Sequence, residues 1–91
     1  MEIIKLGENY EIKSTTDKYV VSGNVIKTVK GDAGLTITIT KLDGTYLATV
    51  SGDYRVSEGR IQMNLNAPIE DYADYVAIMK DIIDTVRTIL N

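Results

Sequence analysis

The side chains of this 91-residue chain that could take part in chemistry are mainly carboxylates, threonines and tyrosines. Asp71 and Asp74, and likewise Asp81 and Asp84, lie three residues apart, a spacing that places each pair on one side of a helix. Paired carboxylates can bind hard metal ions, but such a site needs further oxygen ligands, and none can be identified here. Because both pairs lie opposite the apolar helix positions, we predict a solvated face with neither metal nor cofactor.

The chain contains neither histidine nor cysteine. This composition excludes Ser-His-Asp and Cys-His nucleophilic catalysis, and it also excludes disulfides and cysteine-ligated zinc. We therefore expect no catalytic residue, and we expect the protein not to be an enzyme.

A glycine-rich segment and a row of threonines are the remaining candidate motifs. Gly31-Asp32-Ala33-Gly34 lies between two predicted strands and precedes no helix, so it is typical of a turn and not of a phosphate-binding loop. Thr36, Thr38 and Thr40 share one face of a predicted strand. Neutral hydrogen-bonding faces of this kind can bind sugars or ice, but only one strand carries the full pattern, which favours an ordinary exposed face.

The net charge of −3 is weak and unevenly placed. Residues 1–67 carry eight acidic and eight basic side chains, so the whole acidic excess lies on the C-terminal segment. Without a clustered basic face we expect no nucleic-acid partner, even though several tyrosines could stack on bases. No apolar run reaches the roughly 18 residues that span a bilayer, and the N-terminus does not resemble a signal peptide, so we expect a cytoplasmic protein without membrane contact.

Residues 2–66 have the pattern of consecutive antiparallel strands, with β-branched and aromatic runs separated by turn residues. Gly23 and Gly52 fall inside runs and predict a bulge or bend in each. Asp43-Gly44 predicts a two-residue type I′ hairpin. The predicted strands are residues 2–6, 9–15, 19–30, 35–42, 45–57 (one bent strand) and 60–66.

Residues 68–90 predict the only long helix, with Pro68 at its first position. Two neighbouring apolar stripes run along it, so the apolar arc covers about 160°, against about 100° for an ordinary surface helix. The main stripe consists of Ile69, Tyr72, Val76, Met79, Ile83, Val86 and Leu90, and the second of Tyr75, Ile78, Ile82 and Ile89.

A single helix, about 10 to 12 Å across, cannot cover a flat sheet about 25 Å wide. Either the sheet curls around the helix or a second copy of the chain covers the remainder. We therefore predict a single α+β domain, residues 1–91, in which a curved antiparallel meander of five to six strands (2–66) packs on a helix at about 68–90. In outline this architecture resembles helix-grip and pleckstrin-homology-like folds, although no sequence motif of either family is present, and an architecture does not carry function.

Tyr75, Ile78 and Ile82 are the candidate interaction residues, because they form an association site if the sheet leaves them exposed. The alternative is that a curled sheet buries them. The sequence favours a small non-enzymatic protein–protein interaction module, a regulator or inhibitor of the kind that phages or accessory elements encode, with a protein partner that includes a second copy of itself. The alternative function is a carrier of a small apolar ligand, with a cavity between the strands, Met63 and Met79.

Overall fold

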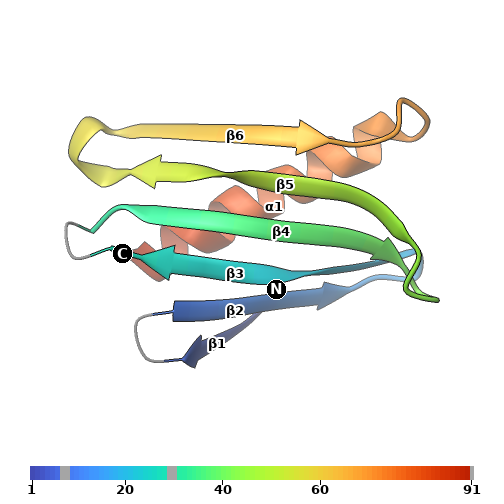
Figure 1. The fold of residues 1–91 in the computed structure, drawn as a ribbon, viewed down its shortest axis with the longest axis horizontal. Coiled ribbons are helices and arrows are strands. Elements are labelled where there is room, and N and C mark those ends of the chain that lie inside the picture. Colours follow the sequence, from blue (N-terminus) through green and yellow to red (C-terminus); the bar gives the residue numbers. More distant parts are fainter. Residues whose placement is uncertain (7–8, 29–30, 91) are drawn as a thin grey trace.

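The computed structural model describes residues 1–6, 9–28 and 31–90. Within these residues the chain forms six strands and one α-helix (Figure 1). The strands pair antiparallel in sequence order, so the sheet is an open meander. The elements are β1 (Glu2–Leu6), β2 (Asn9–Thr15), β3 (Tyr19–Lys27), β4 (Ala33–Lys41), β5 (Tyr46–Arg55), the short 3-10 helix η1 (Val56–Glu58), β6 (Arg60–Asn66) and α1 (Tyr72–Leu90).

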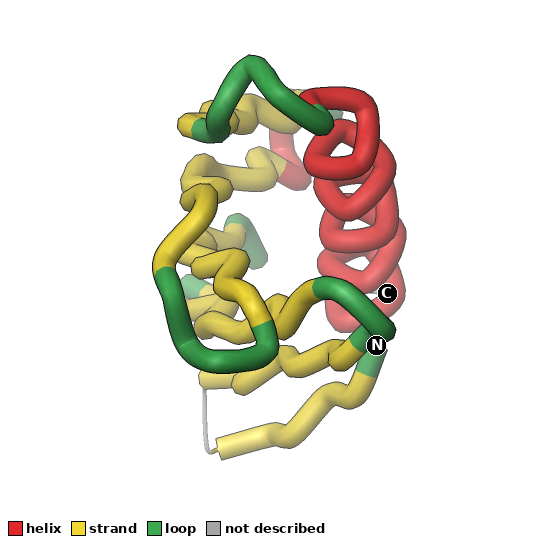
Figure 2. Tube along the Cα trace, turned by 90° about the vertical axis from the view of Figure 1, so that its right-hand side faces the viewer, coloured by secondary structure: helices red, strands yellow, loops and turns green. Residues whose placement is uncertain are grey.

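The sheet is curved, and α1 lies against its concave face, which confirms the predicted architecture. Figure 2 shows β1 and β2 curling toward the helix at one side of the sheet. The curl brings the start of the chain to the helix, where the Thr85 hydroxyl donates a hydrogen bond to the sulfur of Met1 at 3.7 Å. The curved sheet therefore contacts more of the helix surface than a flat sheet could.

Gly23 and Gly52 occupy positions where a neighbouring strand comes too close for a side chain. A Cβ at Gly23 would clash with the carbonyl oxygen of Thr36 on β4, and a Cβ at Gly52 would clash with the carbonyl oxygen of Gln62 on β6. Pairing of β3 with both neighbours continues through Gly23 without a register shift, so this glycine marks a close approach and not a bulge. As predicted, β5 continues through Gly52 as one strand.

The core lies between the concave face of the sheet and the helix. Because successive side chains of a strand point to opposite faces, every second residue of the central strands faces α1. The buried residues are Ile12, Val21, Val25, Ala33, Leu35, Ile37, Ile39, Ala48 and Val50 from the sheet, and Tyr75, Ile82 and Val86 from α1.

The hairpin between β4 and β5 is present, but the predicted two-residue type I′ turn is wrong. A type I′ turn requires positive φ at both central residues. Among the described residues the only non-glycine with positive φ is Asp71, so Asp43 does not adopt this conformation, whereas Gly44 has φ 92°. Instead, Asp43 Oδ1 accepts a hydrogen bond from the backbone N–H of Thr45 at 2.9 Å, and Lys41 pairs with Thr45 across a three-residue loop.

The predicted helix start at Pro68 is also wrong, because α1 begins at Tyr72. Asp71 has φ 60°, the left-handed conformation that ends a helical path and that aspartate tolerates better than most residues. Two turns occupy the preceding residues, with backbone hydrogen bonds from Tyr72 to Ile69 and from Asp74 to Asp71. As a result Ile69, predicted to lie in the main helix stripe, is 94% exposed.

Several strand boundaries differ from the prediction as well. β5 ends at Arg55, because Val56 and Ser57 of the predicted strand 45–57 belong to the 3-10 helix η1. β4 begins at Ala33, two residues early, because the turn that precedes it is tight: Thr28 N–H donates to the carbonyl of Asp32 at 2.7 Å, and Gly31 N–H donates to the carbonyl of Thr28 at 3.0 Å. β3 ends at Lys27, and residues 29–30 of the predicted strand lie outside the described residues.

Candidate interaction surface

The three residues singled out from the sequence lie on the buried side of α1. Tyr75 is 3% exposed and Ile82 is fully buried, while Ile78 is half-buried and packs against the core. An association site at these residues requires that they be exposed. In the single chain, Tyr75 and Ile82 are not. The curled sheet covers them, as in the alternative prediction.

Two contacts identify which side of α1 faces the first three strands. The hydroxyl of Tyr19 on β3 donates a hydrogen bond to Asp74 Oδ2 at 3.2 Å. Thr85, further along the helix, contacts Met1 at the start of β1. Asp74 and Thr85 lie about 60 to 80° to the same side of Ile82, at about 100° per residue. This side of the helix therefore faces β1–β3.

The opposite side of α1, which faces β6, carries apolar residues that the sheet does not cover fully. Tyr72, Val76 and Ile83 lie about 80 to 120° from Ile82, away from the side that faces β1–β3. Tyr72 is 48% exposed. Val76 and Ile83 are half-buried, and within the described helix they lie outside the group of side chains that packs against the buried core.

β6 forms the adjacent edge of the sheet, and in the described part of the chain it pairs with β5 alone. Its apolar residues face the helix side, where Ile61 is 38% exposed. After Arg60 the strand carries no charge up to Asn66. Proteins usually protect edge strands with charges, prolines or bulges. β6 lacks these protections over six of its seven residues.

We call the residues along this side of the molecule the apolar strip: Ile61, Ile69, Tyr72, Val76 and Ile83. Figure 1 shows α1 crossing behind the sheet obliquely, from the β6 side at its start to β3 at its end, so that one end of β5 and β6 extends past it. Monomeric proteins rarely leave long contiguous apolar surfaces in water. The strip is therefore a candidate interface.

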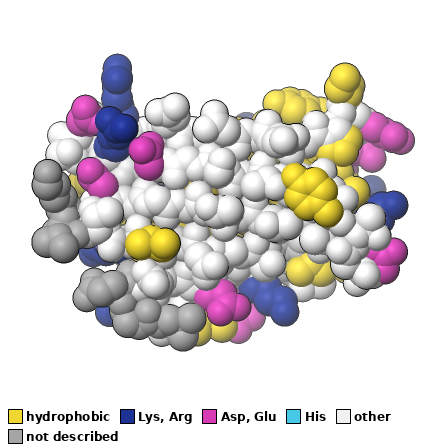
Figure 3. All heavy atoms as spheres, viewed as in Figure 1, with side chains coloured by type: hydrophobic (Ala, Val, Ile, Leu, Met, Phe, Trp, Pro, Cys, Tyr) yellow, Lys and Arg dark blue, Asp and Glu magenta, His cyan; other side chains and the backbone are white. Residues whose placement is uncertain are grey.

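The outer face of the sheet is polar and almost uncharged at its centre. Thr36, Thr38 and Thr40 alternate there with buried residues, as predicted. At the end of the same face, the Tyr46 and Thr49 hydroxyls lie 2.7 Å apart and share a hydrogen bond. Figure 3 shows this face as mainly uncharged polar surface, with apolar side chains gathered toward the end where β6 leads into α1.

An open cleft of about 610 Å³ lies at this same end, beside the start of α1. The rings of Tyr19 and Tyr75 line it, tilted by 48° with centroids 5.6 Å apart. Its lining also includes two lysines, Lys18 and Lys41, and three acidic residues, Asp43, Glu70 and Asp71. Burial, together with the hydrogen bond to Asp74 and its negative charge, raises the pKa of the Tyr19 hydroxyl to about 12. The hydroxyl is thus protonated near neutral pH and cannot act there as a general base.

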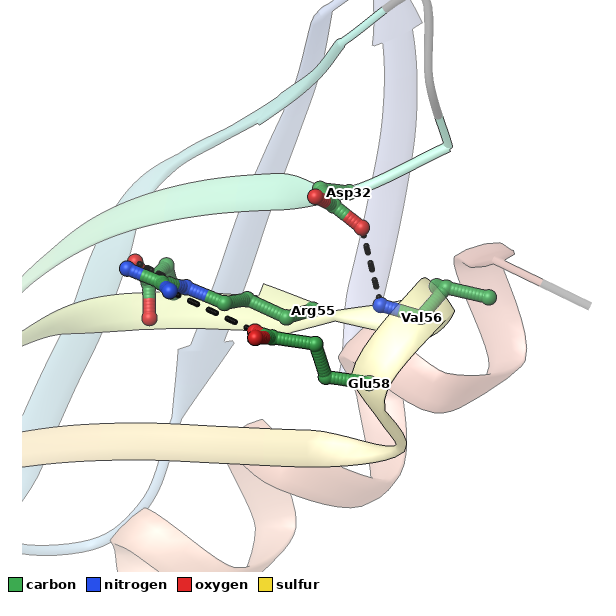
Figure 4. Close-up of polar contacts among 5 residues, drawn as sticks. Asp32, Arg55, Val56 and Glu58 are labelled. Carbon is green, nitrogen blue, oxygen red and sulfur yellow. Dashed lines mark hydrogen bonds and ion pairs between the residues drawn. The ribbon is translucent and has the colours of Figure 1, made fainter.

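An ionic cluster closes the turn that leads into β6 (Figure 4). Arg55 pairs with Glu58 at 3.3 Å and with Asp53 at 3.5 Å, and these two carboxylates raise the pKa of the Arg55 guanidinium. Asp32 Oδ1 accepts a hydrogen bond from the backbone N–H of Val56 at 2.9 Å, which ties β4 to the same turn. These contacts fix where β6 begins.

The other predicted sites are placed as follows. Asp81 and Asp84 are exposed, and among the described residues no group of three or more potential ligands lies close enough to hold a metal ion. Neither Met63 nor Met79 lines any of three clefts that open to solvent. Both methionines pack against the core. These clefts give the ligand-carrier alternative no support. No helix in the described chain has the length and apolar character to cross a membrane.

The strip was not predicted from the sequence, because Tyr72, Val76 and Ile83 belong to the main apolar stripe of the predicted helix and nothing there separates them from the residues that face the sheet. One signal was available: the last predicted strand lacks charge after Arg60 and follows every other strand, so it was a candidate for an unprotected edge. Comparison of the chain with protein-family models, with curated proteins and with solved structures gives no match.

Proposed function

We propose that the chain is a small non-enzymatic interaction module that works as a homodimer, in which a second copy covers the apolar strip. The single observation that carries the proposal is the coincidence of exposed and half-exposed apolar side chains in and before α1 with a sheet edge that carries no charge after Arg60. Strand edges pair readily with another chain, and contiguous apolar surface marks interfaces. On this proposal the dimer acts by binding another protein, as a regulator or inhibitor.

A second copy is the occupant that the charges favour. The chain has a net charge of only −3, so two copies repel each other weakly at physiological ionic strength. The strip itself carries no charge, and it is therefore compatible with an identical strip on a partner. A two-fold axis is the commonest arrangement of homo-oligomers and places the same surface of both copies in contact.

The test is the mass in solution. Sedimentation equilibrium at tens of micromolar should give a species of about 20 kDa, twice the 10.1 kDa of one chain. Ile69→Asp should shift the equilibrium toward the monomer, because it places a charge at the end of the strip. Ile69 is almost fully exposed, so the variant should fold normally.

Leu42→Asp is the matched control. It also replaces an exposed apolar side chain, but one that lines the cleft and lies outside the strip. It should leave the mass unchanged. A single species of 10.1 kDa for the unmodified chain at these concentrations would overturn the proposal.

A further inference from the structure

We infer that the two copies join through β6, paired antiparallel to its counterpart about a two-fold axis at Met63. Two six-stranded sheets then form one continuous sheet with both helices on the same face. This inference rests on the proposed function, because it supplies the interface of the homodimer, and it adds the strand, the register and the arrangement of the helices.

The choice of edge follows from the two outer strands. In an antiparallel sheet, about half of the backbone N–H and C=O groups of an edge strand point away from the sheet and can bond to another strand. β1 offers five residues, of which Glu2 and Lys5 are charged. β6 offers seven, and only Arg60 at its beginning is charged. β6 is therefore the longer and less protected edge.

The register follows from side-chain parity. Opposite residues of antiparallel strands point to the same face, so a continuous sheet must pair inward residues with inward residues. An axis at Met63 pairs all seven residues of β6: Ile61 with Leu65 on the apolar face, and Gln62 with Asn64 on the polar face. It also places the two Arg60 side chains at opposite ends of the paired strands.

Neighbouring registers are poorer. An axis at Gln62 or at Asn64 keeps the parity, but it pairs only five residues within β6. An axis at Asn64 also places Arg60 opposite Pro68, which has no backbone N–H to donate. Met63 is thus the axis that uses the whole strand.

The same arrangement covers the apolar strip. The side of α1 that carries Tyr72, Val76 and Ile83 faces β6, so the two-fold axis brings the corresponding sides of both helices toward each other. A standard stable interface buries about 800 Å² per partner, roughly a seventh of the 5772 Å² that one chain exposes. In the proposed dimer, the paired strands and the apolar strips of both copies would together have to supply this area.

The natural absence of cysteine makes single cysteines clean probes of this interface. Met63→Cys should form a disulfide-linked dimer with itself under mild oxidation, because the axis places the two sulfurs opposite each other. An equimolar mixture of Gln62→Cys and Asn64→Cys should cross-link several times faster than either variant alone. One of these two pairs is a non-hydrogen-bonded pair, in which the side chains lie closest.

Ile4→Cys, on the other edge of the sheet, is the control and should cross-link several times more slowly. Faster cross-linking of Gln62→Cys alone or Asn64→Cys alone would move the axis and overturn the register. Cross-linking only at Ile4→Cys, or at no position while sedimentation still gives about 20 kDa, would overturn the use of β6 but leave the homodimer standing. A monomer in sedimentation would overturn both.

Discussion

Replacing either of two neighbouring isoleucines of α1 by alanine should separate the core from the interface. Ile82 is fully buried between helix and sheet, whereas Ile83 is half-buried in the apolar strip. Both substitutions change the same side chain in the same helix, so any gain in helix propensity is common to both. The difference between them therefore measures packing alone.

The expected loss of stability follows from burial. Ile82→Ala removes three buried carbons at about 0.8 kcal/mol each and leaves a cavity, which together amount to about 3 to 4 kcal/mol. Ile83→Ala removes the same carbons from a half-exposed position without an enclosed cavity, and about 1 kcal/mol is expected. The larger loss is a substantial part of the total stability of a small domain, about 5 to 15 kcal/mol.

Urea unfolding, measured at a concentration where sedimentation gives the monomer, tests these values. For a small domain with an m-value of about 1 to 1.5 kcal/mol/M, the midpoint should fall by about 2 to 4 M for Ile82→Ala and by about 1 M or less for Ile83→Ala. At higher concentration only Ile83→Ala should weaken association without a matching loss of fold. Equal shifts for the two variants, or a larger one for Ile83→Ala, would refute the assignment of core and strip.

Two further variants test the fold and the cleft. The folded-state pKa of the Tyr19 hydroxyl is raised from 10.0 to about 12. The neutral hydroxyl therefore contributes stability that is complete below pH 10 and is lost as the pH rises toward 12. Over this range the urea midpoint of Tyr19→Phe should fall less than that of the unmodified chain. Gly23→Ala should cost about 3 kcal/mol or more, because its Cβ would meet the Thr36 carbonyl, whereas Gly34→Ala, which has open space around the added carbon, should change the thermal midpoint little.

Most of the sheet could be predicted from the sequence because its signals are local. Alternation of apolar and polar residues gives strand positions, and glycine with aspartate or asparagine gives the turns between them. Consecutive strands with short connections pair with their neighbours, so the sheet order followed. Gly23 and Gly52 were predicted to mark a bulge or bend, and at both positions the backbone of a neighbouring strand leaves no room for a side chain.

The two turn errors have one physical cause, since each depended on the φ angle of a single aspartate. Asp43 was expected at positive φ, but its carboxylate accepts the backbone N–H of Thr45, which stabilises a different loop. Hydrogen bonds from the Thr45 side chain and backbone hold the pKa of Asp43 below its usual range. Asp71 was expected inside the helix and instead has φ 60°. Aspartate is compatible with several backbone conformations, so the surrounding structure decides between them.

The sequence left open the rotation of the helix about its axis, and this rotation decides which residues of the arc lie on the sheet. Two adjacent apolar stripes are equally good core faces when only the helix is considered. Contacts from distant parts of the chain select between them: Tyr19 on β3 reaches Asp74, and the start of β1 reaches Thr85. These contacts turn the second stripe toward the sheet, which buries Tyr75 and Ile82.

The width of the apolar arc now has a two-part explanation. A curled sheet and a second copy of the chain were alternative ways to cover about 160° of apolar helix surface. The curl accounts for the face centred on Ile82, but it reaches the helix from the β1 side, where the chain begins beside Thr85. Curling from one side leaves the β6 side of the arc uncovered, and Tyr72 and Ile83 lie there. A sheet that curls around the helix from one side only therefore leaves the β6 side of the arc for the second copy that we propose.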